Sequence, residues 1–306
     1  MRLETKKIAV ATLSVVSNSI LVVLKLVVGL MVGSVSVISE AIHSGVDLLA
    51  AAIALFAVRT SGKPADHCHQ YGHGKVENIS GAVEALLIFV AAGWIVYEAV
   101  QKLIRPEPLD APGWGVAVMA FSSVVNLVVS HLLFKVGKET DSVALQADGW
   151  HLRTDVYTSF GVMAGLALIL AGNTLWPTHD LRWIDPVAAI FVALLILNAA
   201  WHLTVQSMRD LVDRSLPEEE IRWIERYLAS LKGRVKAFHA LRTRKSGPYR
   251  FVEMHVLVDP SMSVQEAHAI TDEIDAAISQ KLANARVTVH VEPYEPRRAA
   301  RPSGGA

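Results

Sequence analysis

The sequence predicts a membrane-embedded bundle of six α-helices followed by a small α/β domain. Of 306 residues, 52% are hydrophobic and only 19% are charged, whereas ordinary soluble domains carry roughly 25% charged residues. Six apolar segments are long enough for the roughly 20-residue helix that crosses a bilayer. After about residue 214 the chain becomes polar and mixes helical with strand periodicity. We therefore expect an all-α transmembrane domain over 1–210, a cytoplasmic α-β-β-α-β domain over 211–296, and a disordered tail over 297–306.

The charge balance excludes several classes of protein. There are 29 Lys and Arg residues and 29 Asp and Glu residues, so the chain lacks the broad basic surface expected of a nucleic-acid-binding protein. The single cysteine, Cys68, excludes an intrachain disulfide framework. We expect the lipid bilayer, and no nucleic acid, as a partner.

The first apolar segment is preceded by basic residues, but it is too long for a signal peptide and no small-residue cleavage site follows it. Lys and Arg flank the N-terminus, the second connection and the fourth connection, which predicts that both termini lie in the cytoplasm. The predicted spans are 8–33, 35–58, 79–103, 112–135, 143–172 and 184–208.

The C-terminal region carries its own start and turn signals. A helix is expected to begin at a Ser215 cap, ahead of three acidic residues, and to run to about Leu231. Ser246-Gly247-Pro248 predicts a turn between two strands. The expected elements after the first helix are strands at 235–244 and 251–258, a helix at 263–282 and a last strand at 287–291.

Two predicted spans contain the same pair of ionisable residues. His43 and Asp47 lie in the second span, and His151 and Asp155 lie in the fifth. The i, i+4 spacing places each pair on one helix face, and an ionised Asp at mid-span costs about 2.5–3.5 kcal/mol. Two imidazoles and two carboxylates would suit a tetrahedral Zn²⁺ site. The alternative is hydrogen bonding between helices without a metal.

A second cluster lies in the polar connection after the second span. Five possible ligands occur within eight residues, and short His-rich tracts are typical of metal binding; the alternative is a solvated polar loop. These residues are Asp66, His67, Cys68, His69 and His73.

The C-terminal domain offers a third set of possible ligands. His290 and Glu292 share one face of the last predicted strand because their spacing is i, i+2. His239, His255 and His268 would join them only if the strands pair suitably, which one sequence does not establish.

Other ionisable residues of the spans have weaker assignments. Glu40 and Asp148 lie three residues before the two histidines and could carry protons, support the ligands, or reach toward an interface. Arg153 should point away from His151 by its position on the helix. The remaining residues are expected to serve helix ends or packing: Lys25, Glu84, Glu98, His131 and His202.

Together these motifs resemble the cation diffusion facilitator family, in particular its bacterial zinc and iron efflux antiporters, over about residues 8–296. The resemblance rests on the two His/Asp pairs and on four further segments: Gly33-Ser34-Val35-Ser36, Tyr71-Gly72-His73-Gly74-Lys75, Leu211-Val212-Asp213-Arg214-Ser215-Leu216-Pro217 and Leu241-Arg242-Thr243-Arg244-Lys245-Ser246-Gly247-Pro248.

The resemblance implies a homodimer in a bacterial inner membrane with a metallochaperone-like cytoplasmic domain. It implies a charge pair between Lys75 and Asp213. Zinc and iron efflux relatives carry Asp in place of His43 and in place of Glu292, which implies a narrower metal range here and a different bridging of metals in the cytoplasm. The implied metal ligands are His43, Asp47, His151 and Asp155 (transport site); Asp66, His69 and His73 (loop site); and His239, His255, His268, His290 and Glu292 (cytoplasmic site).

The predicted function is export of a divalent metal ion, not catalysis. Because metal binding to imidazole and carboxylate displaces protons, we expect a zinc/proton antiporter that works by alternating access, with zinc also regulatory. Two imidazoles favour Zn²⁺, Co²⁺ or Ni²⁺ over Mn²⁺; Fe²⁺, Mn²⁺ and Cd²⁺ stay open. The alternatives are a manganese or iron(II) exporter of the same architecture and a membrane-anchored metal sensor. A membrane metalloprotease is not supported, since its His-Glu-x-x-His signature is absent.

Overall fold

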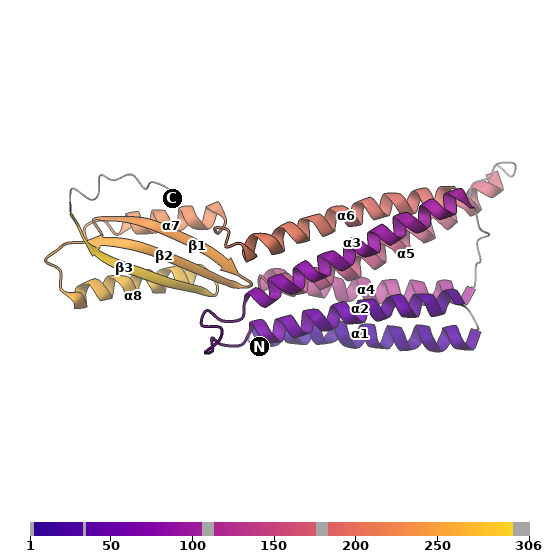
Figure 1. Ribbon diagram of the computed structural model, residues 1–306, viewed down its shortest axis with the longest axis horizontal. Helices are drawn as coiled ribbons and strands as arrows, with labels where there is room; N and C mark the ends of the chain where they lie inside the picture. Colours follow the sequence, from indigo (N-terminus) through magenta and orange to yellow (C-terminus); the bar gives the residue numbers. More distant parts are fainter. Residues whose placement is uncertain (1–2, 33–34, 106–112, 176–182, 296–306) are drawn as a thin grey trace. The chain divides into compact units, whose positions relative to one another are not determined.

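The computed structural model describes residues 3–32, 35–105, 113–175 and 183–295. The chain divides into two compact units, Met1–Met208 and Arg209–Ala306, which are drawn in Figure 1. The predicted third connection around Pro106–Pro112, most of the fifth connection and the predicted disordered tail at 297–306 lie outside the described residues.

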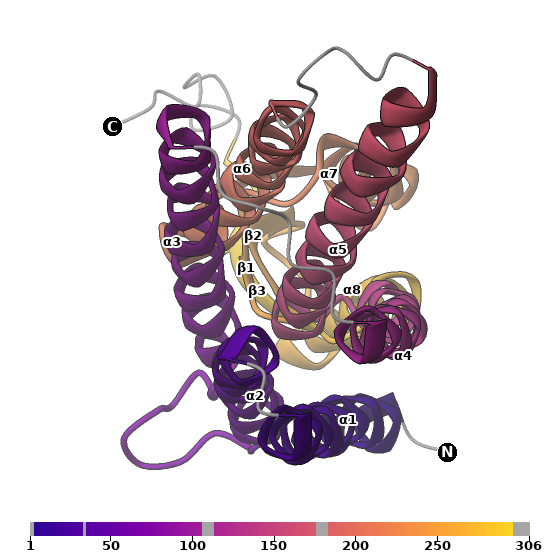
Figure 2. The same ribbon diagram turned by 90° about the vertical axis from the view of Figure 1, so that its right-hand side faces the viewer.

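The first unit consists of long helices, which confirms the predicted all-α membrane domain (Figures 1 and 2). Five of the helices are long and apolar enough in their described residues to cross a membrane. The sixth, α5, carries Asp148, His151, Arg153 and Asp155 in its first four turns, so its ionisable residues lie in the half nearest its start. The helices are α1 (Leu3–Val32), α2 (Val35–Ser61), α3 (Lys75–Ile104), α4 (Gly113–Glu139), α5 (Val143–Leu175) and α6 (Ile184–Leu211).

Small residues allow these helices to approach closely, as is common in membrane bundles. One buried cluster joins α1, α2, α4 and α5 through residues such as Ala11, Ala57, Leu133 and Ala144. A second cluster joins α3 and α6, with Ala147 of α5 included. At Gly81 a Cβ atom would lie 2.7 Å from Ser207 Oγ and 2.8 Å from Val143 Cγ1, so glycine is required where α3 meets α5 and α6.

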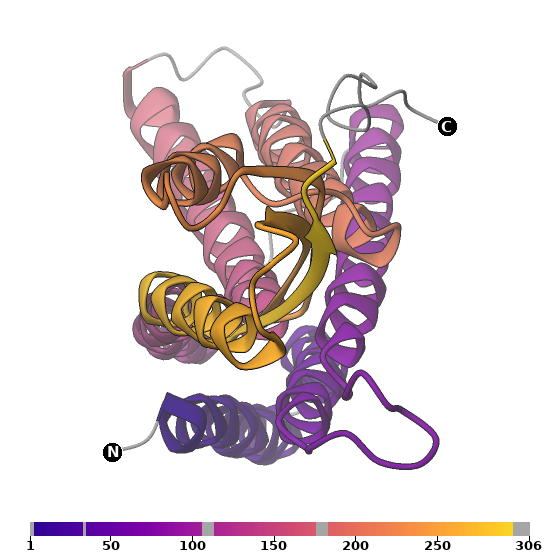
Figure 3. The ribbon, with the colours of Figure 1, turned by 90° about the vertical axis from the view of Figure 1, so that its left-hand side faces the viewer.

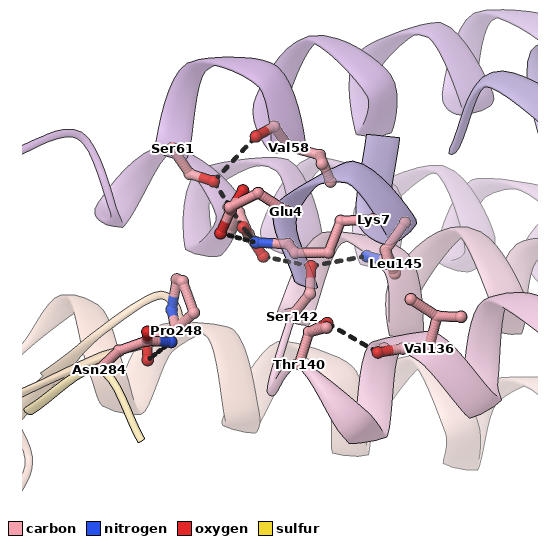
Figure 4. A network of polar contacts seen from close by, with 12 residues as sticks. Glu4, Lys7, Val58, Ser61, Val136, Thr140, Ser142, Leu145, Pro248 and Asn284 are labelled. Carbon is pink, nitrogen blue, oxygen red and sulfur yellow. Dashed lines mark hydrogen bonds and ion pairs between the residues drawn. The ribbon is translucent and has the colours of Figure 1, made fainter. Parts of the chain in front are cut away.

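A buried ion pair joins the helix ends nearest the N-terminus. Lys7 Nζ of α1 lies 2.6 Å from Glu77 Oε1 of α3, and both side chains are almost fully buried. Ser61 Oγ at the end of α2 donates to the same carboxylate oxygen at 2.5 Å. Ser142, in the turn between α4 and α5, donates to the other oxygen. Figure 4 shows Lys7 between Ser61 and Ser142. This network therefore ties five helices together at one end of the bundle.

The second unit is an α/β domain built on a three-stranded mixed sheet of order β1-β2-β3. β1 pairs antiparallel with β2, and β2 pairs parallel with β3. The predicted α-β-β-α-β order is confirmed. The elements are α7 (Glu218–Ser230), β1 (Ala237–Ser246), β2 (Tyr249–Val258), α8 (Val264–Lys281) and β3 (Ala285–Pro293).

Both helices of this unit cover the same face of the sheet (Figure 3). Ile224 and Leu228 of α7, and Ile274 and Ile278 of α8, pack in one core cluster with alternate residues of β2. Because side chains alternate across a strand, the intervening residues of the sheet face away from the helices. That second face carries the histidines described below.

The helix starts differ from one another. Ser263 caps α8, since its hydroxyl accepts the Glu266 backbone N–H and the Glu266 carboxylate accepts the Ser263 backbone N–H. The prediction that Ser215 caps α7 is wrong. The residue before α7 is Pro217, and no side chain makes a cap hydrogen bond there.

Candidate metal sites

The two predicted intramembrane pairs meet crosswise between α2 and α5. His151 Nε2 lies 3.1 Å from Asp47 Oδ1, and His43 Nε2 lies 3.7 Å from Asp155 Oδ1. One ligand atom each from His43, Asp47 and Asp155 fall within 4.8 Å of one another. Asp155 Oδ2 and His151 Nδ1 are buried without a hydrogen-bond partner among the described residues. The arrangement therefore offers nitrogen and oxygen atoms at distances that one cation could bridge.

A cavity of about 80 Å³ opens beside this cluster. Its lining comes from the halves of α1 and α2 that are nearest their connection at 33–34, together with α4 and α5. Lys25 lines it, 6% exposed, and its ammonium donates to Ser44 Oγ at 2.8 Å. The sequence predicted that Lys25 serves a helix end or a packing contact rather than binding metal, and its hydrogen bond to Ser44 is a contact between α1 and α2. The lining residues are Lys25, His43, Asp47, Ser122, Ser123, Asn126, Asp155, Thr158 and Ser159.

Three further ionisable residues of α3 and α5 lie outside this cluster. Arg153 donates to Ser130 Oγ of α4 at 3.3 Å and lies 5.4 Å from the Phe134 ring centre, so it points away from the site as predicted. Asp148 is fully buried one turn from His151, and neither of its carboxylate oxygens is hydrogen-bonded among the described residues. Glu84 of α3 is also fully buried and accepts from Ser80 Oγ at 3.0 Å. The sequence assigned Glu84 to a helix end or a packing contact, and its full burial shows that it lies in the interior.

The loop cluster forms around the Asp66 carboxylate. Its Oδ1 accepts the backbone N–H groups of His69 at 2.7 Å and Cys68 at 2.9 Å. His73 Nε2 lies 3.3 Å from Oδ2, and the His69 and His73 ring centres are 4.5 Å apart. The backbone hydrogen bond from His69 and the neighbouring N–H group of Cys68 hold the pKa of Asp66 below its ordinary value. Gly72 has φ +86°, a backbone conformation that favours glycine and closes the turn that returns His73 to Asp66.

Ligand atoms of Asp66, His69 and His73 all lie within 4.8 Å of one another. His67 and Cys68 are exposed in the same loop, and the described cluster does not include them. The structure therefore selects three residues from the five that the sequence offered.

The cytoplasmic histidines form a row across the sheet. Strand pairing sets His239 of β1 opposite His255 of β2, and His255 opposite His290 of β3. The ring centres are 5.0 Å apart in the first pair and 4.7 Å apart in the second. The β1–β2 register shifts directly after His239, where Ala240 has φ +50°. A β-bulge often re-aims side chains next to a functional site, and here it ends the regular pairing at the row of histidines.

Glu292 joins this row from two residues further along β3. Its carboxylate lies 2.9 Å from His255 Nδ1, 3.2 Å from His239 Nε2 and 3.6 Å from His290 Nε2. The hydrogen bonds with His239 and His255 hold the pKa of Glu292 below its ordinary value. His268 lies apart on α8, where it contacts Thr271 and Asp272. Its membership in the cytoplasmic site stays a prediction, as does the Lys75–Asp213 pair. Within its own unit, Asp213 accepts from Arg244 at 3.3 Å.

Residues 11–212 match the model of the cation efflux transmembrane domain, and residues 216–294 match that of the cation efflux protein cytoplasmic domain, a dimerisation domain. The chain belongs to the cation efflux family, the cation diffusion facilitators. It is a transporter of divalent metal cations, not an enzyme, and it is a multi-pass membrane protein. The family predicted from the motifs is confirmed.

Relatives match this cation diffusion facilitator over most of its length. An uncharacterized transporter of Synechocystis is 38% identical over 263 residues, which cover 86% of this chain and 83% of the relative. The cation-efflux pump FieF of Klebsiella pneumoniae is 32% identical over 275 residues, which cover 90% of this chain and 89% of the pump. A solved structure of CzrB is 38% identical and covers 26% of this chain and 99% of that chain, with a TM-score of 0.26.

Proposed function

We propose that this facilitator exports Zn²⁺ in exchange for protons by alternating access, with His43, Asp47, His151 and Asp155 as the transport site. The observation that supports the proposal is the crosswise meeting of the two His/Asp pairs. Each helix supplies one imidazole and one carboxylate, and each imidazole lies within 3.1–3.7 Å of the other helix's carboxylate. Ligand atoms of His43, Asp47 and Asp155 lie within 4.8 Å of one another, and His151 lies 3.1 Å from Asp47. Two imidazoles and two carboxylates are a set that tetrahedral Zn²⁺ can take.

The same donor set supports the exchange of metal for protons. Zinc binds neutral imidazole and ionised carboxylate, so protonation of the ligands weakens the site and metal binding releases protons. Histidine, with a reference pKa of about 6.5, changes charge in the pH range across a cell membrane. Thiolate ligands would hold zinc more tightly, but the chain's single cysteine, Cys68, lies in the exposed loop after α2.

The two ends of the bundle differ in a way that supports alternating access. The cavity beside the transport cluster lies toward the α1–α2 connection, whereas the buried network of Lys7 and Glu77 ties the helices at the end that carries the N-terminus. If both termini are cytoplasmic, as the basic flanks predict, this network closes the bundle toward the cytoplasm. Export would require the Lys7–Glu77 end to part.

We also propose regulatory zinc sites in the loop (Asp66, His69, His73) and on the cytoplasmic sheet. His239, His255, His290 and Glu292 lie on the sheet face that α7 and α8 leave uncovered, and His268 is retained as a possible fifth ligand. Metal bound there between two subunits of a homodimer would favour one arrangement of the dimer over another. The Lys75–Asp213 pair would link that change to the membrane domain.

The decisive experiment is flux into proteoliposomes loaded with a zinc-sensitive dye. The purified protein should carry Zn²⁺ into vesicles whose interior is more acidic than the medium, because protons then flow out as zinc enters. The proton gradient should dissipate as zinc moves. Competition with Fe²⁺, Mn²⁺, Co²⁺, Ni²⁺ and Cd²⁺ tests the metal preference. Preferred transport of manganese or iron would contradict the zinc assignment, and metal binding without flux would show a sensor instead.

A further inference from the structure

We propose that the positive charge of Lys25 compensates the carboxylates of the transport site when no metal is bound, and so promotes release of the metal. This inference rests on the proposed transport site and deepens it. Lys25 is the one basic residue among the described residues that line the cavity with His43, Asp47 and Asp155.

The position of the Lys25 ammonium is fixed by α2. Its Nζ donates to Ser44 Oγ at 2.8 Å, and Ser44 lies between His43 and Asp47 in the chain. Both Lys25 and Ser44 are almost fully buried, at 6% and 3% exposure. A buried ammonium is costly unless anions or dipoles compensate it, and the carboxylates that share its cavity are those of Asp47 and Asp155.

Lys25 changes the net charge of the transport site in both its empty and its metal-bound state. With neutral imidazoles, the two carboxylates and Lys25 sum to −1 when the site is empty and to +1 when it holds a divalent ion. Without Lys25 the sums would be −2 and 0. The lysine therefore stabilises the empty site and repels the bound ion, and in a partly buried cavity such interactions are much stronger than in water.

A membrane carrier needs this balance. A site with two uncompensated buried carboxylates would hold a divalent ion tightly and would be costly to leave empty while the bundle changes conformation. The ammonium of Lys25 weakens the binding of the divalent ion and lowers the cost of the empty site. It remains in the site because it is covalently attached to α1. Its other neighbours in the cavity wall, Ser122, Ser123, Asn126, Thr158 and Ser159, are uncharged, so the lysine is the group that sets this charge balance.

The test compares zinc binding and zinc flux in Lys25→Met and Lys25→Arg. All proteins are full-length and carry Asp66→Ala and His255→Ala, so that calorimetry reports the transport site. We expect Lys25→Met to bind Zn²⁺ at least about tenfold more tightly. Its maximal flux and its half-saturating zinc concentration should both be lower. Lys25→Arg, which keeps the charge, should remain near the parent protein.

Ser44→Ala is the matched control, because it removes the hydrogen bond but keeps the positive charge of Lys25. It should change zinc affinity much less than Lys25→Met does. If Lys25→Met does not fold, Lys25→Gln serves in its place and is interpreted in the same way. Equal or weaker zinc binding in the neutral variants would overturn the inference and assign Lys25 to packing. Absence of flux in the wild-type protein would instead refute the proposed function, and the affinity comparison would still be measurable.

Discussion

Asp47 of α2 and His151 of α5 are separated by 104 positions in the chain, and their side chains meet at 3.1 Å in the buried interior of the membrane unit. A buried carboxylate and an imidazole that meet in this way either form a hydrogen bond of purely structural value or hold a shared ion. The two cases differ in what a substitution does.

Asp47→Asn tests this point. The change preserves shape and removes one negative charge, so a structural hydrogen bond with His151 could persist while the affinity for a divalent ion falls. Loss of a residue that only supports a metal ligand costs about 10–100-fold in affinity, and loss of a ligand should cost at least that. We expect zinc flux in proteoliposomes to fall by about 100-fold or more. Glu98→Gln is the control, because Glu98 is an exposed carboxylate of α3 paired with Lys102 at 3.4 Å. Wild-type flux in Asp47→Asn would show that the pair is structural.

His43→Asp tests metal choice. It replaces one of two imidazoles by an oxygen ligand, and oxygen-rich sites discriminate less strongly in favour of zinc. His43 lies 3.7 Å from Asp155, so the shorter acid would also add repulsion between carboxylates in the empty site. We expect the variant to accept a broader range of metals, with zinc flux inhibited more strongly by added Cd²⁺. Unchanged discrimination between zinc and cadmium would contradict this role for His43.

The transport cluster shows what sequence reasoning can and cannot reach. The i, i+4 spacing identified both His/Asp pairs because helical periodicity is local. Their crosswise partnership depends on how α2 packs against α5, which no local pattern contains. The partner of Lys25 was not predictable for the same reason. A lone charge in an apolar span is itself a signal of a polar partner, but the partner, Ser44, becomes evident only when the helices are packed.

His290→Ala tests the regulatory site. His290 contributes to the row of rings across the sheet and lies 3.6 Å from Glu292, so its loss should weaken metal binding there without altering the core on the opposite face. Spin labels in the full-length dimer would measure the zinc-dependent change in distance between the two cytoplasmic domains. We expect this change to require a zinc concentration at least about tenfold higher. Thr288→Ala is the control, since Thr288 lies on the same strand and the same face. An equal zinc response in His290→Ala and wild type would argue against this site.

The cytoplasmic site was only partly predictable. The i, i+2 spacing placed His290 and Glu292 on one face from sequence alone. That His239 and His255 join them follows from strand register, which is set by long-range pairing. The Ser215 cap failed because Pro217 occupies the position before the helix, so the acidic residues that follow were a better guide to the helix start than the serine.

An exposed ion pair makes the cytoplasmic unit sensitive to acid. Arg234 donates two hydrogen bonds to Glu273 of α8, at 2.5 and 2.9 Å, and these hold the pKa of the Glu273 carboxyl below its ordinary value. A lowered folded-state pKa stabilises the fold at pH above the unfolded value of 4.5, and this contribution is lost as pH falls through the folded value. We expect Glu273→Gln to reduce hydrogen-exchange protection of α8 at pH 7 and to differ little from wild type at the acidic end. Glu225→Gln, an exposed change on α7, should not reproduce this trend. A difference that is constant across pH would contradict the assignment.

The buried pair of Lys7 and Glu77 should be the most sensitive point of the membrane unit. Removing one member of a buried ion pair leaves an uncompensated charge and costs about 3–5 kcal/mol. The two members are not equivalent. Lys7→Met leaves the Glu77 carboxylate with the hydroxyl donors Ser61 and Ser142. Glu77→Met leaves both hydroxyls without that acceptor and leaves the Lys7 ammonium with the more distant Glu4 carboxylate, at 3.7 Å.

We therefore expect Glu77→Met to destabilise the protein more than Lys7→Met, with each change lowering the unfolding temperature in detergent. The double variant should recover part of the loss, because two apolar side chains can replace a buried pair at little cost. Lys6→Met is the control, since the Lys6 ammonium lies 3.8 Å from Glu139 and is 43% exposed, and exposed pairs contribute roughly 0–1 kcal/mol. If the double variant were less stable than Glu77→Met alone, the pair would not act as a compensating unit. Because this network joins α1, α2, α3 and the turn between α4 and α5, the same variants should also shift the membrane domain toward access from the end that carries Lys7. Labelling of cysteines introduced beside the transport site would measure this shift.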